Sequence, residues 1–370
     1  MKKSRIVEYL LVLCLFAALC EFLYADYTGQ RTNVILVVFF FIGAATFLIE
    51  NRRIRMNELI KIIVSLWVLV WSINIQSVRY FLTLMSIFFW TKHKFKDLEK
   101  NIKMMTAIGV LMAFYQFLNG RTRVSGFYAN SPTQLACTLY VFETYLFIKL
   151  TNHKMDKSTF ALVTLSLITI FLTETRSVLL AASIVFAFYL MIILVNSSRI
   201  KSKRELFMLL IAVALPILAI NSQTLMDFVH SRFHRTNGDA SNFTRMYMYN
   251  TMIGLLKNNP KMLFIGGKGG FAHNLFGAAA GQYLPVHQDF LLIVVEYGIV
   301  GLSAVLLTFL WRKRTALYFF MVFGICSFHN AVLNPELMIL IGITMADLER
   351  NGDRIIPFRR DKNEAGREKA

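Results

Sequence analysis

Two arginines in the sequence have a charge and a position that suit the binding of an anion at a membrane surface. Arg176 stands between two apolar runs, where a charged side chain is a candidate for function unless it only reaches the lipid headgroups. Arg245 begins a stretch, 244–257, with apolar residues at helical spacing. A guanidinium group binds a diphosphate through two hydrogen bonds, and a helix N-terminus adds a favourable dipole. The alternative for Arg245 is a solvated loop arginine.

His287 follows Pro285 and precedes a long apolar run. A histidine at the start of a helix can act as an acid or a base near neutral pH, and an ordinary interfacial polar residue is the alternative. Glu296 lies nine positions further on, which places it on the opposite side of a helix from His287. We therefore interpret Glu296 as a packing residue, in a segment whose Gly298 and Gly301 let helices approach closely.

Further basic side chains lie between the apolar runs near these candidates. Few acids accompany them, which suits a phosphate-bearing lipid or an acidic glycan, while headgroup contact is the alternative for each one. They are Arg31, Arg79, Arg121, Arg123, His230, Arg232, His234, Arg235 and His273, of which Arg121, Arg123, Arg232 and Arg235 are the predicted substrate-binding residues. Residues 266–270, Gly-Gly-Lys-Gly-Gly, lack the spacing of a nucleotide phosphate loop and are interpreted as a tight turn.

The composition indicates the elements that must position these residues. The chain has 370 residues, of which 56% are hydrophobic and 17% charged, with a mean hydropathy of +0.52 and a formal net charge of +18. A soluble domain is about 25% charged, so a soluble nucleic-acid-binding protein is excluded and a polytopic membrane protein is indicated. All four cysteines lie inside apolar runs and no HExxH motif occurs, so we predict no disulfide, metal or cofactor.

Apolar runs long enough to cross a bilayer recur along the chain. We predict an all-α integral membrane protein with about twelve transmembrane helices. The short loop at 74–76 leaves open whether residues 59–91 hold one span or two. The predicted spans are 6–24, 33–49, 59–74, 76–91, 102–119, 132–149, 159–174, 177–195, 205–221, 288–310, 315–331 and 335–348.

The basic residues indicate how these helices cross the membrane. With twelve spans, 29 of the 40 lysines and arginines fall on one side, and the positive-inside rule makes that side, with both termini, cytoplasmic. Residues 1–221 then hold helices 1–9, and residues 287–348 hold helices 10–12. Residues 222–286 between them form one long extracytoplasmic loop subdomain, where we expect function. Residues 349–370 are predicted to be a disordered cytoplasmic tail.

Several motifs, in this order, resemble the O-antigen ligase and polysaccharide polymerase superfamily of membrane glycosyltransferases. They are Gly-Phe-x-x-Asn-x-Pro at 126–132, Thr-x-Thr-Arg-Ser at 173–177, the Arg-led helix and glycine turn of the long loop, and His-x-x-Phe-Leu-x-x-x-x-Glu-x-Gly-Ile-x-Gly at 287–301. The sequence departs from the family at Thr175, where the family has serine, and at Gln288, where asparagine or serine is more usual.

The resemblance implies a GT-C-like fold and an inverting, metal-independent transfer of a glycan from undecaprenyl diphosphate. The reaction would take place at the outer face of a bacterial cytoplasmic membrane. By that analogy Arg176 and Arg245 would hold the diphosphate and stabilise the leaving group, and His287 would orient or deprotonate the acceptor hydroxyl. The implied partners are the lipid-linked oligosaccharide, membrane lipids and other polysaccharide export and chain-length proteins, with no nucleic acid.

Three interpretations of the function remain open. We favour a polymerase of a capsular, exopolysaccharide or O-antigen repeat, which transfers the glycan to another lipid-linked repeat unit. A ligase of the same superfamily transfers it to a different acceptor. A transporter of lipid-linked oligosaccharides is the alternative from another class, although transporters more often show paired half-repeats with broken helices at the midplane.

Overall fold

The computed structural model describes residues 30–50, 54–71, 73–128, 131–153, 156–197, 238–280, 288–310, 313–329 and 334–356. Within these residues every regular element is a helix, which agrees with the predicted all-α class. The predicted spans 6–24 and 205–221 lie outside the described residues, as do His230, Arg232, His234, Arg235 and His287. The count of twelve transmembrane helices therefore stays a prediction.

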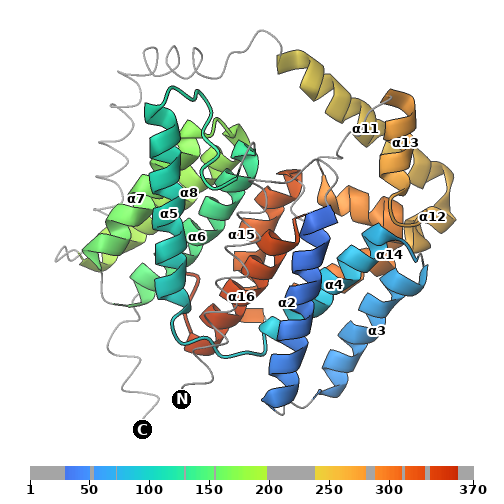
Figure 1. Cartoon of the computed structure of the whole chain (residues 1–370), viewed down its shortest axis with the longest axis horizontal. Coiled ribbons are helices and arrows are strands. Elements are labelled where there is room, and N and C mark those ends of the chain that lie inside the picture. The colour runs from blue at the N-terminus through green and yellow to red at the C-terminus, as the bar shows by residue number, and fades with distance from the viewer. Residues whose placement is uncertain are drawn as a thin grey trace.

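The helices run back and forth as an elongated bundle (Figure 1). In chain order they are α2 (Gln30–Ile49), α3 (Met56–Trp71), α4 (Ile75–Trp90), α5 (Leu98–Leu118), α6 (Pro132–Asn152), α7 (Lys157–Leu172), α8 (Arg176–Ser197), α11 (Gly238–Asn258), α12 (Pro260–Ile265), α13 (Phe271–Ala280), α14 (Asp289–Leu310), η1 (Lys313–Thr315), α15 (Ala316–Cys326), η2 (Ser327–His329) and α16 (Pro335–Asn351).

The core of the bundle is formed around α6 and α16. Residues 135–150 of α6 and 335–348 of α16 are all buried. Because they are buried on every side, polar residues included, these two helices are surrounded by the rest of the bundle. Figure 1 shows α5, α7 and α8 on one side of these helices and α2, α3, α4 and α14 on the other.

Asparagine and aspartate side chains begin several helices. Asn74 accepts a hydrogen bond from the Ser77 backbone N–H and so separates α4 from α3, which makes the two predicted segments distinct helices. Asn259 and Asn334 cap α12 and α16, and each precedes a proline at the first helical turn. At Asp156, which caps α7, hydrogen bonds from the side chains of Thr159 and Ser158 lower the carboxyl pKa below its ordinary value.

Three of the described helices are long and apolar enough to cross a membrane. They are α5, the Arg176–Ile193 part of α8, and α14. Three shorter apolar helices accompany them, over Leu36–Ile49, Lys157–Leu172 and Ala316–Cys326. This set supports a membrane protein, because a helix of about 20 apolar residues matches the thickness of the bilayer core.

Candidate active site

Arg176 is the first residue of α8 and is exposed. The turn before it is fixed by its own side chains. The Thr173 hydroxyl donates to Thr175 Oγ1 at 3.1 Å and accepts the Thr175 backbone N–H at 3.3 Å. Glu174 has a φ of 57°, in the left-handed region that closes a tight turn between two helices. The turn thus sets Arg176 at a helix N-terminus, a place that favours anions.

The loop that carries Arg121 and Arg123 lies against this turn. Arg123 Nε donates to the Thr173 carbonyl oxygen at 3.2 Å and lies 3.7 Å from Glu174 Oε2. Residue 124 adds a backbone hydrogen bond, from its N–H to the Leu172 carbonyl oxygen at 3.3 Å. The structure therefore brings the segments of three predicted site residues together, although they lie about fifty positions apart in the sequence.

A glutamine side chain at the end of α5 holds the same loop. Gln116 Oε1 accepts the backbone N–H groups of Ser125 and Gly126 at 2.8 and 2.9 Å. Its Nε2 donates to the Gly126 carbonyl oxygen at 2.8 Å. The amide thus provides hydrogen-bond partners for backbone groups of a loop that is neither helix nor strand. These bonds fix the loop in one position.

A groove on the outside of α5 ends at this loop. Its apolar part is formed by Leu111, Met112 and Tyr115, and its polar part by Gln116, Asn119 and Arg121. A surface that is apolar along the helix and cationic at the helix end suits a lipid with an anionic headgroup.

His329 lies beside the start of α8, which the sequence did not predict. Its Nε2 lies 2.6 Å from Ser177 Oγ, in the residue that follows Arg176. Hydropathy placed His329 inside the predicted span 315–331, but α15 ends at Cys326 and a 3₁₀ turn follows it. Asn334 begins the next helix, and this cap could have indicated that His329, five residues earlier, lies in the connection between two helices.

The other predicted catalytic residues are placed only in part. Arg245 lies in α11, which extends the predicted helix over 244–257, and the position of its side chain lies outside the description. His287 falls outside the described residues, two positions before α14 begins. Their meeting with Arg176 in one site remains a prediction. In the part of the chain that is described, no three His, Cys, Asp or Glu side chains form a metal-binding group.

The glycine turn at 266–270 lies in a break of α14. Backbone N–H groups of the turn donate to the carbonyl oxygens of Val295 and Glu296 at 2.8 and 3.0 Å. Gly298 has a φ of 69°, and a Cβ atom there would lie 2.1 Å from the Phe264 carbonyl oxygen. The predicted tight turn is confirmed, and the close approach expected at Gly298 occurs between α14 and the end of α12.

Side chains of α4 complete this contact. Asn74 Nδ2 donates to the Gly269 carbonyl oxygen at 2.7 Å, and Ser77 Oγ lies 3.3 Å from Tyr297 Oη. The rings of Tyr80 and Tyr297 stack with centroids 5.2 Å apart. The long loop is therefore anchored on α4 and α14. We call the end of the bundle at which α8 begins the Arg176 end (Figure 1).

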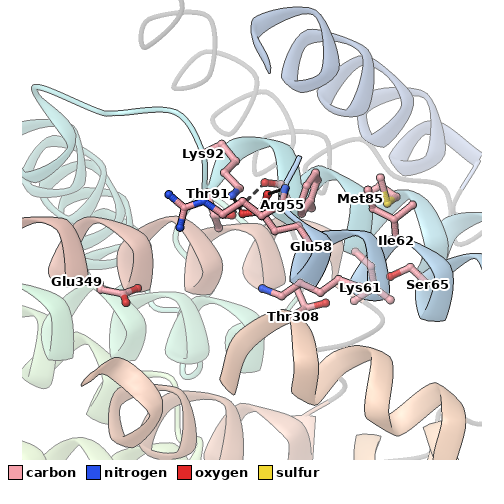
Figure 2. A pocket seen from close by; sticks show the side chains of 12 residues that line it. Arg55, Glu58, Lys61, Ile62, Ser65, Met85, Thr91, Lys92, Thr308 and Glu349 are labelled. Carbon is pink, nitrogen blue, oxygen red and sulfur yellow. Dashed lines mark hydrogen bonds and ion pairs between the residues drawn. The ribbon is translucent and has the colours of Figure 1, made fainter. Parts of the chain in front are cut away.

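A polar cavity lies at the opposite end, which we call the Lys149 end. It has a volume of about 200 Å³ and is lined by residues of α3, α4, α14 and α16, together with Arg55 and the two residues that follow α4. Figure 2 shows Arg55, Glu58 and Lys92 close together on one side of it and Glu349 on the other. Glu58 pairs with Lys92 and accepts the Arg55 backbone N–H at 2.9 Å. Two of its charged side chains thus form an ion pair, and none of the predicted site residues lines it.

The helix that Arg176 begins lies inside a match to a known family. Residues 161–306 match the family described as O-antigen ligase. The matched segment begins in α7, includes Arg176 and Arg245, and ends in α14. A search of curated proteins found no match. The chain is therefore similar to the O-antigen ligase family over residues 161–306.

Proposed function

We propose that the protein is a polysaccharide polymerase, which transfers a glycan from undecaprenyl diphosphate to a lipid-linked repeat unit at the outer face of the cytoplasmic membrane. The observation that carries the proposal is the position of Arg176. It begins an apolar helix inside the O-antigen ligase match, and the loop of Arg121 and Arg123 is hydrogen-bonded to the turn before it. The cations and the helix N-terminus together suit a diphosphate.

In the proposed reaction an acceptor hydroxyl attacks the anomeric carbon of the donor sugar. The new glycosidic bond forms as the bond from that carbon to the diphosphate oxygen breaks, and the diphosphate leaves with the electron pair. Arg176 and Arg245 would stabilise the negative charge that grows on the leaving group. His287 would take the acceptor proton. No metal is part of the proposal, because a lipid diphosphate is already an activated leaving group.

The groove on α5 supports a lipid-linked donor. Leu111 and Tyr115 are exposed, with 69% and 71% of their surfaces accessible, and Arg121 lies above them. A polyprenyl chain on the apolar part would place its diphosphate near the loop of Arg121 and Arg123. Arg232 and Arg235 are proposed as further contacts to the glycan or the diphosphate.

Two other functions remain as competitors. A ligase would use the same donor site with a different acceptor. The break in α14 favours a transporter, since broken helices are typical of transporter binding sites. The glycine turn fills that break and satisfies its carbonyl groups, however, so the break has an anchoring role in this protein.

The proposal is tested with purified protein in detergent and lipid-linked repeat units. A polymerase lengthens the glycan without any membrane gradient, which transport cannot do. Single alanine variants of Arg176, Arg245 and His287, expressed at normal levels, are expected to lose long chains on a ladder gel. Normal long chains from all three would refute the site, and transfer to a non-repeat acceptor alone would identify a ligase.

A further inference from the structure

We propose that Ser177 and His329 act as one hydrogen-bonded unit that completes the diphosphate site beside Arg176. The inference rests on the proposed function, since it takes the lipid diphosphate as the ligand at the same helix N-terminus. It adds two side chains to the three catalytic candidates, and one of them lies beyond the segment that matches the O-antigen ligase family.

The geometry of the pair is specific. His329 Nε2 lies 2.6 Å from Ser177 Oγ, across 152 positions of sequence. Ser177 is the second residue of α8, so its hydroxyl lies in the first turn, where backbone N–H groups have no partner within the helix. An anion bound there would meet the Ser177 hydroxyl together with the guanidinium of Arg176.

The hydrogen bond decides which way the serine hydroxyl points. A hydroxyl has one hydrogen to donate and can accept as well, and a neutral imidazole has one N–H. When His329 donates its Nε2–H to Ser177 Oγ, the serine hydrogen is left to donate to a phosphate oxygen. A bound diphosphate favours this arrangement, because its oxygens accept hydrogen bonds and cannot donate when ionised. His329 is therefore a positioning residue that acts through Ser177.

Both partners of the pair come from fixed segments. The turn before α8 is held by the Thr173 and Thr175 hydroxyls. On the other side Ser327 is fully buried, and its hydroxyl donates to the Gly324 carbonyl oxygen at 2.9 Å. Two such segments hold the pair in place before a ligand arrives, which lowers the entropy cost of binding.

The test measures equilibrium binding of undecaprenyl diphosphate to the full-length protein in lipid nanodiscs. The variants are Ser177→Ala, His329→Ala, their combination and His329→Gln. Each alanine variant is expected to raise the Kd about tenfold, as for one lost hydrogen bond to a charged group. The double variant should match either single one, because both remove the same unit. His329→Gln keeps an N–H donor and should recover most of the affinity.

Two measurements separate binding from structure. The midpoint of thermal unfolding should stay within about 2 °C of the wild-type value for all four variants, as expected for an exposed contact. His153→Ala removes the same side chain at the Lys149 end, where it pairs with Asp353, and should leave the Kd unchanged. A lower melting temperature with an unchanged Kd would show that the hydrogen bond only ties α15 to α8, and would overturn the inference.

The outcome also separates this inference from the proposed function. Chain growth by the wild-type protein, with unchanged Kd values in the variants, overturns the role of the pair and leaves the polymerase assignment intact. Binding that depends on the pair, without chain growth, supports the pair and removes the polymerase assignment. A wild-type protein that does not bind undecaprenyl diphosphate overturns the inference outright.

Discussion

The two ends of the bundle differ in the acids that accompany their basic residues. At the Lys149 end, Lys149 Nζ lies 2.7 Å from both Asp347 and Asp353, and these side chains are almost completely buried. Arg350 donates there to the carbonyl oxygens of residues 91 and 93. At the Arg176 end, residues 120–131 contain two arginines and no acid, and Glu174 is the acid beside Arg123.

This difference shows that the side of the membrane on which a basic residue lies does not by itself tell whether that residue stabilises the fold or binds a ligand. A buried cation that is paired with buried acids connects the helices that carry them. Removal of one partner leaves an uncompensated buried charge and destabilises the fold. The proposed diphosphate site lies at the Arg176 end because Arg176 begins α8 there, and a helix N-terminus favours an anion.

The largest expected effect is at Lys149. Lys149→Met leaves Asp347 and Asp353 without their cation, and the free energy of unfolding should fall by about 3–5 kcal/mol. Arg123→Met at the other end breaks a partly exposed pair and should cost under about 1 kcal/mol. Thermal or denaturant unfolding in detergent measures both. Equal losses from the two substitutions would remove the contrast between the ends.

Arg176→Ala should lower the rate of chain growth by about 10²–10³-fold, the usual loss when one stabilising donor is removed from a transition state. Arg176→Lys keeps the charge without the planar fork and should recover part of that rate. Arg55→Ala, in the cavity of Figure 2, is the matched control and should leave the rate near the wild-type value. A larger loss from Arg55→Ala than from Arg176→Ala would move the site to the Lys149 end.

Gly298→Ala tests whether the glycine turn anchors the long loop. Its φ of 69° and the 2.1 Å approach of the Phe264 carbonyl oxygen should together cost about 1–3 kcal/mol, measured by unfolding, and should slow chain growth. Gly254→Ala is the control in α11, where an added Cβ meets nothing within 4 Å and should gain about 0.5–1 kcal/mol. Loss of stability from Gly254→Ala but not Gly298→Ala would contradict this anchoring.

The smallest effect is expected at the loop of Arg121 and Arg123. Gln116→Leu removes the hydrogen bonds to Ser125 and Gly126, and the donor KM should rise about tenfold, equivalent to about 1.4 kcal/mol. Thr164→Ala in α7 loses only a bond to the Phe160 carbonyl oxygen, away from this loop and groove, and should change the KM less than twofold. An unchanged KM for Gln116→Leu would show that donor binding does not depend on the hydrogen bonds from Gln116 to the loop.

The sequence by itself predicted the helical class, which the described residues share, and it offered Arg176 as a site residue, which stays a prediction. Apolar runs are local signals, so they predicted the helices that became α8, α11 and α16. The motif order predicted the superfamily, which the match over 161–306 confirms. The turn at 266–270 was also predicted, because its glycines suit backbone angles that other residues avoid.

The tertiary structure alone decided which distant segments meet. The 2.6 Å contact of Ser177 with His329, and the hydrogen bond from Arg123 to Thr173, join residues whose spacing has no periodic pattern. Hydropathy averages over a window, so it kept His329 inside a span and could not detect the 3₁₀ turn that ends α15 at Cys326. Local periodicity specifies helices, whereas the packing of side chains between helices determines which of their ends form a site.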